Sequence, residues 1–377
     1  MSETPDTTTS TDTNTDAQRD ALGAAFGRSA DPLAEFAPTF EQADVDPFAL
    51  FDADILGARN LADGSRNKYL TAFRHWREHM DHEGRHPACP NEQHVKTFVQ
   101  RERAERGNND ETTKMKLQKL NAAYEYWVDD PQFPHPQDYN PFKLAQSKVA
   151  LDGPNRKEPP RLPVDDLRDV VGDVNHLRDR AVIVTQLKLG LRAGELRNIK
   201  LSEVSVENAA VREHYPDLGT NPMLDGRENA VYIPHDRDGN KSKRPRVLPL
   251  DDETRRALFH YLLARPDNGE PWVFLAPEQH TQMKRKTVNA LWKKAFHPEY
   301  DETEHHRAIT SHFGRHRFTT YWRVEQDVNT ELIHYMRGDV VGGSAMDDDR
   351  GAMNYYIHTY YEDIESLYRE NIYKLNF

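Results

Sequence analysis

The 377-residue sequence contains one cysteine, Cys89, and no long uninterrupted run of apolar residues. One cysteine cannot form an intramolecular disulfide, and without Cys or His partners at ligand spacing it makes a poor metal site. A membrane-spanning helix needs about 18 consecutive apolar residues, and Met1 is followed by acidic, Thr-rich sequence where a signal peptide would be basic and then apolar. We therefore expect a cytoplasmic protein with no metal and no membrane contact.

An excess of positive charge is also lacking, because 62 Asp and Glu outnumber 50 Lys and Arg and the formal net charge is −12. Proteins that bind nucleic-acid phosphates are usually basic. Residues 1–54 hold twelve Asp and Glu and two Arg, so they contribute −10 and the other 323 residues only −2. Arg outnumbers Lys 33 to 17, and the planar guanidinium suits phosphate recognition better than an ammonium. The net charge therefore does not exclude a nucleic-acid partner, and the low Lys content with many Asp and Glu indicates a salt-rich cytoplasm.

The distribution of apolar residues divides the chain into four segments. Residues 1–44 have few large apolar side chains, so we expect a disordered acidic arm. Residues 45–150 have apolar residues at helical spacing, with Ser65 at an expected N-cap, and should form a small helical domain. Residues 151–162 are rich in proline and charge without periodicity, which is typical of a linker. Residues 163–377 should form a second domain.

The second domain combines helices with one pair of short strands. Helical patterns are expected at 163–171, 179–189, 251–263, 286–296 and from 312 onward. Residues 230–235 and 245–250 flank a polar turn containing Asp-Gly and Asn, which predicts a β-hairpin. The predicted fold class is therefore mainly α: a helical domain followed by an α+β domain with a small antiparallel sheet.

Basic residues of the helical domain have two interpretations. They could contact the DNA backbone from a groove, or they could form an ordinary solvated face, which Glu102, Glu105 and Glu111 favour by interrupting the run. The residues are Lys96, Arg101, Arg103, Arg106, Lys114, Lys116 and Lys119.

The segment LGLRAGEL, residues 189–196, ends a long apolar helix. Gly190 can leave the helix where a side chain would clash, which presents Arg192 at a helix junction, and Glu195 can brace that guanidinium. The alternative is an ordinary helix C-cap followed by a surface arginine.

Two further segments of the second domain carry cations. The predicted hairpin tip GNKSKRPR, residues 239–246, can place an ammonium beside a phosphate oxygen, or it is simply a solvated turn. In SHFGRHRF, residues 311–318, His312 and Arg315 are three residues apart. That spacing puts both side chains on one helix face, where they can address the same anion, although such pairs are also common in unrelated proteins.

Tyrosines are dense in NYYIHTYYEDI, residues 354–364. Aromatic clusters usually indicate packing. A tyrosine hydroxyl is nevertheless a competent nucleophile when nearby positive charge stabilises its phenolate.

Taken in order, these four segments resemble the catalytic domain of the tyrosine recombinase/integrase family, of the phage-integrase-like and Xer type. The set is G-L-R-x-x-E-L, a basic hairpin, H-x-x-R-H and Y-x-H. The preceding helices resemble the family's SAM-like core-binding domain, so the resemblance covers residues 50–375. With the salt-rich composition, it suggests a halophilic archaeon as the source.

The resemblance implies one catalytic residue or more at each motif. These are Arg192, Lys241, His312, Arg315 and Tyr356, with Lys243 as the alternative to Lys241. Tyr356 would attack the scissile phosphate to give a 3′-phosphotyrosyl intermediate, and the arginines would hold the developing charge. His312 would assist proton transfer and Lys241 would protonate the leaving oxygen. No cofactor would be needed, because the covalent ester keeps the bond energy, and the sequence has no P-loop.

The resemblance also implies partners. Double-stranded DNA would be the substrate, bound by a homotetramer on two synapsed duplexes, so we expect a cytoplasmic, nucleoid-associated protein. Two alternatives stay open: a non-cutting DNA-binding accessory protein of the same fold, and a relaxing enzyme like the type IB topoisomerases. The DNA target depends on contacts with base edges that the sequence does not reveal.

One position departs from the family pattern. Where Leu-Gly-His or a tryptophan is typical before the tyrosine, this chain has Met336-Arg337-Gly338-Asp339. A carboxylate therefore stands where a hydrogen-bonding histidine is expected, unless His334 takes that role. The non-cutting alternative rests on this departure.

The last helical segment carries an apolar stripe. It consists of Ile364, Leu367, Tyr368, Ile372 and Leu375. The stripe could dock on a neighbouring protomer or close its own domain, and the sequence does not decide between the two.

Overall fold

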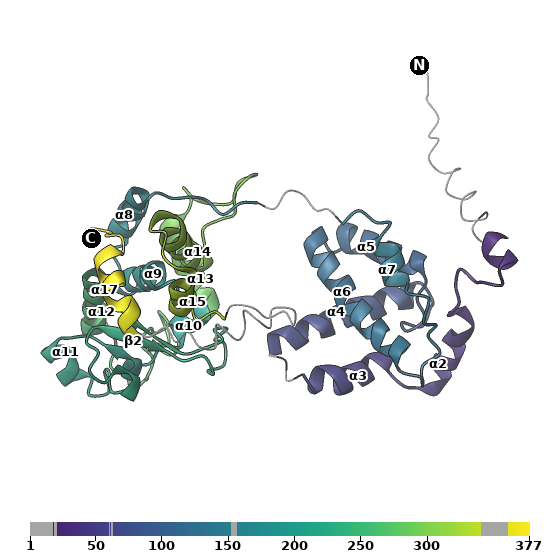
Figure 1. Cartoon of the computed structure of the whole chain (residues 1–377), viewed down its shortest axis with the longest axis horizontal. Coiled ribbons are helices and arrows are strands. Elements are labelled where there is room, and N and C mark those ends of the chain that lie inside the picture. The colour runs from purple at the N-terminus through teal and green to yellow at the C-terminus, as the bar shows by residue number, and fades with distance from the viewer. Residues whose placement is uncertain (1–17, 19–20, 60, 62, 152–156, 341–360) are drawn as a thin grey trace, which may run out of the picture. The chain divides into compact units, whose positions relative to one another are not determined.

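The computed structural model describes residues 18, 21–59, 61, 63–151, 157–340 and 361–377. The chain divides into two compact units, unit 1 (Met1–Arg156) and unit 2 (Lys157–Phe377), shown in Figure 1. Each unit has its own buried hydrophobic core, as expected of separate domains.

The regular secondary structure of unit 1, over its described residues, is entirely helical. Its elements are η1 (Ala34–Phe36), α2 (Ala37–Ala43), α3 (Pro47–Phe51), the π-helix η2 (Asp52–Gly57), α4 (Asp63–His82), α5 (Glu92–Ala104), α6 (Asp110–Asp129) and α7 (Pro141–Gln146). Helices α4 and α6 pack together and bury Phe73, Trp76 and Trp127. Asn91 fixes the start of α5, because its Oδ1 accepts from the His94 N–H at 3.0 Å while His94 Nδ1 accepts from the Asn91 N–H at 3.1 Å.

The expectation of a disordered arm over residues 1–44 is wrong at the end of that segment. Leu33 is fully buried in the core of unit 1 and Phe40 packs against it, so the last part of the arm folds as η1 and α2. Composition underestimates order here because the few apolar residues from Leu33 to Phe40 lie against one core, whereas Leu22 and Phe26 are exposed. Helix α4 also begins earlier than predicted, at Asp63, so Ser65 lies inside its first turn and is not the N-cap.

The predicted linker, residues 151–162, ends sooner than expected. The Glu158 N–H donates to the His305 carbonyl at 3.0 Å, and the Glu158 carbonyl accepts from the Arg307 N–H at 2.9 Å. Leu162 is buried in the core of unit 2. The final residues of the predicted linker are therefore part of unit 2.

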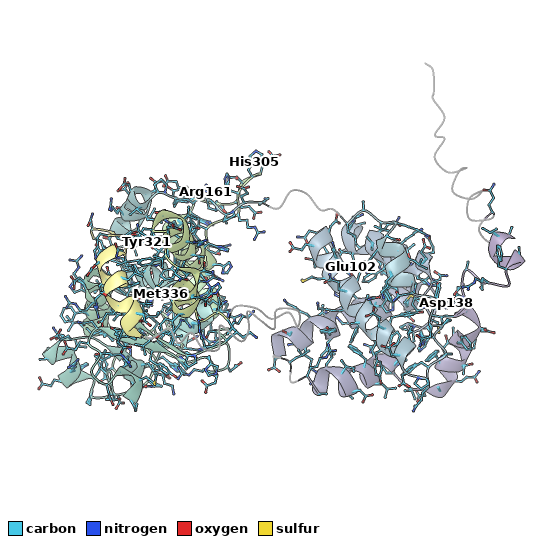
Figure 2. The ribbon with its side chains drawn as sticks, in the orientation of Figure 1. Glu102, Asp138, Arg161, His305, Tyr321 and Met336 are labelled. Carbon is cyan, nitrogen blue, oxygen red and sulfur yellow. The ribbon has the colours of Figure 1, made fainter. Side chains whose placement is uncertain are left out.

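Most of the basic residues singled out in the helical domain are ion-paired within unit 1. The pairs are Lys96–Glu92, Arg101–Glu105, Arg103–Asp110, Arg106–Glu102 and Lys116–Glu102. Glu102 lies among the helices of unit 1 (Figure 2) and is almost fully buried; it is also 3.0 Å from His75 Nδ1. The contacts of Glu102 join α4, α5 and α6, so for Arg106 and Lys116 they favour a structural role over a DNA-binding groove. The cations of the other three pairs are partly exposed.

Unit 2 is mainly helical. Its elements are α8 (Val164–Asp173), α9 (Leu177–Leu189), α10 (Ala193–Arg197), η3 (Leu201–Glu203), β1 (Val204–Ser205), α11 (Ala209–His214), η4 (Pro222–Leu224), β2 (Ala230–Ile233), β3 (Arg246–Pro249), α12 (Asp252–Ala264), α13 (Arg285–Phe296), α14 (Ser311–Thr320), the π-helix η5 (Tyr321–Glu325), α15 (Thr330–Arg337) and α17 (Tyr361–Asn371). Helix α9 is buried on every side over residues 181–189, and α12 and α14 pack against it (Figure 1). A helix that is buried all round belongs in a core, and its buried polar side chains have partners there, as Gln186 does with Trp292 and Lys188 with Asp251.

The strands form one antiparallel sheet in the order β1-β2-β3. Val231 of β2 lies opposite Val204 of β1 and Leu248 of β3. The predicted fold class is confirmed, including the β2–β3 hairpin. Strand β1 was not predicted, because two residues are too few to show an alternating pattern.

The C-terminal stripe packs on unit 2 itself. Ile364, Tyr368, Ile372 and Leu375 are buried in the unit 2 core, and the Tyr368 hydroxyl donates to the Lys188 carbonyl at 2.9 Å. Of the two alternatives left by the sequence, the structure therefore has the one in which the stripe closes its own domain.

No helix in the described part of the chain is long and apolar enough to cross a membrane. The described residues also contain no group of three or more His, Cys, Asp or Glu side chains placed to hold a metal ion. Cys89 is buried, and burial raises the pKa of its thiol to about 12. A thiol in that environment stays protonated and acts as a small core residue.

Candidate active site

Arg192 lies at a sharp junction between two helices. Helix α9 ends at Gly190, whose backbone is left-handed with φ 63°, and a Cβ at this position would lie 2.6 Å from the Phe318 ring. Only glycine satisfies both the backbone and the available space. Arg192 follows two residues later as the N-cap of α10, so its side chain extends from a rigid, buried turn.

Glu195 holds Arg192 in place. Its Oε2 accepts from the Arg192 backbone N–H at 2.9 Å, and its Oε1 lies 3.2 Å from Arg192 Nη1. On the other side, Nη2 of the fully buried Arg246 lies 3.2 Å from Oε2. Burial opposes ionisation of this carboxyl, but Arg246, the Arg192 N–H and Arg315 together lower the pKa of Glu195 below its ordinary value. Glu195 is therefore a fixed anion beneath the site.

Helix α14 contributes the second arginine and the histidine. Arg315 is buried, and its Nη1 donates to the Gly190 carbonyl at 3.0 Å. His312, one turn earlier, reaches solvent, and its ring centroid lies 4.4 Å from that of His316. Partial exclusion of water, followed by the charges of His316, Arg315 and Arg192, lowers the pKa of His312. The imidazole is therefore neutral at pH 7 and able to accept a proton.

Three guanidiniums converge on one carboxylate, Asp339. Its Oδ1 lies 3.1 Å from Arg192 Nη2 and 2.9 Å from Arg315 Nη2, and its Oδ2 lies 2.9 Å from Arg315 Nη2 and 2.9 Å from Arg337 Nη2. We call Arg192, Arg315 and Arg337 the arginine cluster. Burial opposes ionisation of Asp339, but the cluster lowers its pKa, so the carboxylate is charged at neutral pH. Burial and the neighbouring Arg192 lower the pKa of Arg315 to about 10, which leaves it cationic at neutral pH.

The end of α15 presents Asp339 to the cluster. Gly338 caps the helix in a left-handed conformation with φ 65°, and a Cβ there would lie 2.4 Å from Arg246 Nη1. The Asp339 N–H donates to the His334 carbonyl at 3.0 Å. Arg246 Nε donates to the carbonyl of Met336, labelled in Figure 2, at 2.8 Å. Arg246 therefore ties β3 to both Glu195 and the last turn of α15.

The basic hairpin packs against the same junction. A Cβ on Gly194 would lie 2.3 Å from the Gly239 carbonyl oxygen, so glycine at this position of α10 allows the hairpin tip to approach. The Lys243 N–H donates to the Gly338 carbonyl at 2.8 Å. The Lys241 and Lys243 side chains are exposed, and Lys241 makes no hydrogen bond or ion pair with any other residue that the structure describes. The two lysines are thus available to a ligand, but neither contacts the arginine cluster.

Tyr356, the predicted nucleophile, lies outside the described residues, so its place relative to the arginine cluster stays a prediction. Its neighbour Tyr361 is described. The Tyr361 hydroxyl donates to Glu365 at 2.8 Å, and burial together with that carboxylate raises the pKa of Tyr361 to about 12. A phenol held in this way is a poor nucleophile at neutral pH.

Asp339, and not His334, meets the arginines. His334 was the other residue considered for the position of the family's histidine. Its Nδ1 is buried and has no hydrogen-bond partner among the described residues. The departure from the Leu-Gly-His pattern therefore places a carboxylate, and not an imidazole, against the arginines.

Two residues of the site were missed by sequence reasoning, Arg246 and Arg337. Arg246 opens the apolar strand RVLP, and an arginine inside a buried strand requires a buried anion, which was a usable signal. Arg337 stands next to Gly338 in the departing motif. Nothing local distinguishes it from a helix-terminal surface arginine, because the cations that share its partner Asp339 are Arg192 and Arg315, which come from distant segments.

One family model matches the segment that contains the arginine cluster. Residues 161–338 match the model described as the phage integrase family. This segment is a phage integrase domain. It extends from just before α8 to the cap of α15, so the arginine cluster and Glu195 all lie within the phage integrase domain.

Two curated proteins are similar to the chain. A putative integrase/recombinase, y4rF, of Sinorhizobium fredii is 31% identical over 170 residues, which are 43% of this chain and 34% of that protein. Tyrosine recombinase XerA of Pyrococcus horikoshii is 25% identical over 198 residues, which are 52% of this chain and 56% of that protein. The chain thus spans only about a third to a half of the length of these relatives.

Solved structures share the fold. The Tn1549 transposon integrase in complex with transposon right-end DNA is 17% identical, with a TM-score of 0.57 over 85% of this chain and 97% of that one. A lambda integrase dimer bound to a COC′ core site is 11% identical, with a TM-score of 0.54 over 82% of this chain and 93% of that one. At these identities, the similarity concerns the fold of the phage integrase domain and the helices before it.

Proposed function

We propose that this chain is a site-specific tyrosine recombinase that cleaves and rejoins duplex DNA through a 3′-phosphotyrosyl intermediate. The observation that carries the proposal is the convergence of Arg192 and Arg315 on one carboxylate oxygen, Oδ1 of Asp339, at 3.1 and 2.9 Å. A non-bridging phosphate oxygen needs the same arrangement of donors. The two arginines come from segments 123 residues apart in the sequence, so their meeting is a product of the fold.

The arginines would stabilise the charge that develops on the phosphate. Phosphodiester cleavage without a metal needs fixed positive charge at the non-bridging oxygens, placed before the reaction begins. Glu195 holds Arg192, and the Gly190 carbonyl holds Arg315, so both guanidiniums are oriented by groups that do not depend on DNA. His312, neutral at pH 7, would accept the proton of the attacking hydroxyl or donate an N–H hydrogen bond to the same phosphate.

The proposed nucleophile is Tyr356, and the proposed acid for the 5′ leaving oxygen is Lys241, with Lys243 as the alternative. The Lys243 N–H is bonded to the Gly338 carbonyl, which supports a position of the hairpin tip beside the arginine cluster. The ester formed with Tyr356 would conserve the bond energy, so a free 5′ hydroxyl from a partner strand could reverse the step without a cofactor.

Double-stranded DNA is the proposed partner, held by the helical domain and the phage integrase domain of each protomer. A lambda integrase tetramer bound to a Holliday junction has the same fold, with a TM-score of 0.55, which supports a tetramer on synapsed DNA for this chain as well. This substrate would place the protein on the nucleoid, in the cytoplasm.

One observation favours a second candidate, a non-cutting DNA-binding protein of the same fold. Asp339 occupies the N–H groups of Arg192 and Arg315 that the recombinase proposal assigns to the scissile phosphate. In a protein that never cleaves DNA, that ion pair would be permanent.

A trapped covalent adduct tests the proposal. Wild-type protein is incubated with nicked duplexes that carry candidate sites from the neighbourhood of its gene, with a chelator present, and a denaturation-resistant protein–DNA adduct is sought. We expect an adduct with wild type and with Tyr361→Phe, and none with Tyr356→Phe. Arg315→Lys, which loses the planar fork, should slow adduct formation by about 10²–10³-fold. If wild type binds these duplexes without forming an adduct on any of them, the non-cutting candidate replaces the recombinase.

The choice between Lys241 and Lys243 has its own test. In a substrate with sulfur at the 5′ bridging position, the leaving group needs no proton. The variant that lacks the true acid should cleave normal DNA slowly and regain its cleavage rate on the sulfur substrate. The other lysine variant should have the same cleavage rate, relative to wild type, on both substrates.

A further inference from the structure

The two carboxylates at the arginine cluster are held in different ways. Glu195 is fully buried, and besides its arginine partners it accepts a backbone N–H, that of Arg192. Asp339 is bonded through guanidiniums only, among the described residues, and its side chain is 24% exposed. Glu195 is therefore part of the framework, whereas Asp339 is an anion that solvent can reach.

The side chains around Asp339 carry a net positive charge. Arg192, Arg246, Arg315 and Arg337 carry four positive charges, and Glu195 and Asp339 supply two negative ones. An incoming phosphodiester carries one negative charge. It would compete with the Asp339 carboxylate for the same N–H groups, because one face of a guanidinium cannot hold two anions at about 3 Å.

The backbone around Asp339 is held by hydrogen bonds that do not involve its carboxylate. The Asp339 N–H is bonded to the His334 carbonyl, and the preceding Gly338 carbonyl is bonded to the Lys243 N–H. Rotation about the side-chain bonds of Asp339 would therefore release the carboxylate without unwinding α15. The Arg337 and Arg192 side chains are each 26% exposed, so an anion from solvent could take the vacated position.

We propose that Asp339 is a placeholder for phosphate: its carboxylate holds the arginine cluster together in the free protein and is displaced when a DNA phosphate binds, with Arg337 as a third phosphate ligand beside Arg192 and Arg315. This proposal rests on the proposed function for the identity of the anion. Because the phosphate must displace Asp339, DNA binds more weakly than it would to a cluster without this carboxylate. When no DNA is present, Asp339 keeps the three guanidiniums paired.

Removing the charge of Asp339 should have effects of opposite sign on stability and binding. In full-length Asp339→Asn, the melting temperature without added anions should fall, because the three guanidiniums lose a shared partner. The rise in melting temperature with inorganic sulfate, at constant ionic strength, should exceed that of wild type. Affinity for duplex DNA should increase by roughly tenfold, the scale of one charge-assisted hydrogen bond, because the phosphate no longer has to displace a carboxylate.

A matched pair elsewhere in unit 2 controls for general changes of charge. Arg323 and Asp327 form an exposed ion pair at 3.3 Å, so Asp327→Asn and Arg323→Gln make the same charge changes away from the cluster. Neither should alter the sulfate response. Arg337→Gln should reduce sulfate and DNA affinity relative to Arg323→Gln, which tests the third ligand independently of Asp339.

The proposal is overturned if Asp339→Asn binds sulfate and DNA no more tightly than wild type, or if Arg337→Gln binds them as wild type does. These outcomes are separate from those of the proposed function. Adducts with wild type but no gain in affinity from Asp339→Asn would reject the placeholder and keep the recombinase. A gain in affinity with no adduct on any duplex would keep the placeholder and reject the recombinase.

Discussion

At the scale of single residues, the site depends on glycines that permit contacts no other residue could make. Gly190 turns the chain toward Arg192 and supplies the carbonyl that holds Arg315. Gly338 lets the end of α15 lie against Arg246. The positions of the cations are therefore set by the backbone, which explains how like charges can be held close together before any ligand arrives.

Substitution of Gly190 by alanine should destabilise the protein by roughly 2–4 kcal/mol, because left-handed strain adds to a steric clash with Phe318. Gly226→Ala is the matched control, since Gly226 also has a positive φ, 71°, but a Cβ added there would meet nothing within 4 Å. It should cost only about 1 kcal/mol. Urea unfolding of both variants measures the difference, and equal losses would contradict the proposed clash.

The lowered pKa of His312 predicts the pH dependence of cleavage. A histidine whose pKa is lowered stays neutral until the pH falls below its ordinary value of 6.5. If neutral His312 accepts a proton, adduct formation at sub-saturating DNA, which reports the free enzyme, should fall on the acid side with a midpoint below pH 6.5. His312→Gln should lack that acid limb. A midpoint above pH 6.5 in wild type would show that another group controls the rate.

At the scale of elements, a buried ionic cluster fastens the C-terminal tail to α9 and α12. Lys188 Nζ lies 2.6 Å from Asp251 Oδ2 and 2.6 Å from Glu253 Oε2. The Glu253 carboxylate also accepts the backbone N–H groups of Leu375 and Asn376 at 2.8 and 2.7 Å. The end of the chain is therefore part of the domain's framework.

Lys188→Met should cost about 3–5 kcal/mol at pH 7, because two buried carboxylates lose their ammonium. Burial opposes ionisation of Asp251 and Glu253, yet Lys188 helps to keep both pKa values below normal. Their contribution to stability is thus present above the unfolded pKa values and is lost as pH falls through the lower folded ones. The difference in free energy of unfolding between wild type and Lys188→Met should accordingly become smaller as pH falls, because protonated carboxyls carry no charge for the ammonium to balance.

Lys374→Met is the matched control for Lys188. Lys374 Nζ lies 3.2 Å from the same Asp251 carboxylate, but its side chain is 44% exposed. Its loss should cost under about 1 kcal/mol. Chemical denaturation between pH 4 and 8 measures both variants, and a pH-independent deficit in Lys188→Met would contradict the ionic account.

The elements that the sequence predicts are those with a repeating pattern. Helices with regular apolar spacing, such as α12 and α13, and the β2–β3 hairpin were expected close to their observed limits. Strand β1 and helix α2 were not, because one is too short to alternate and the other contributes only a few apolar residues to a core formed mainly by distant helices. A short element has too few residues to show a periodic pattern, so long elements are predicted more reliably than short ones.

At the scale of the whole molecule, the sequence predicts which motif residues belong to the candidate site better than it predicts the ion pairs between them. Ordered motifs were enough to single out Arg192, His312 and Arg315, and the fold brings the two arginines together. The role of Arg246 could not be read in the same way, because it depends on contacts between residues 51 and 90 positions apart. The roles of all five site residues stay predictions. Tyr356 lies outside the described residues, and Lys241 forms no hydrogen bond or ion pair with the cluster.

The identity of the tyrosine that becomes joined to DNA is the most direct test of the central claim. The trapped adduct would be digested with protease and nuclease, and the peptide carrying a nucleotide would be sequenced by mass spectrometry. The account predicts a 3′-phosphate ester on Tyr356. An ester on Tyr355, Tyr360 or Tyr361, or on a serine, would contradict the assignment of the nucleophile and the alignment of the last motif on which it rests.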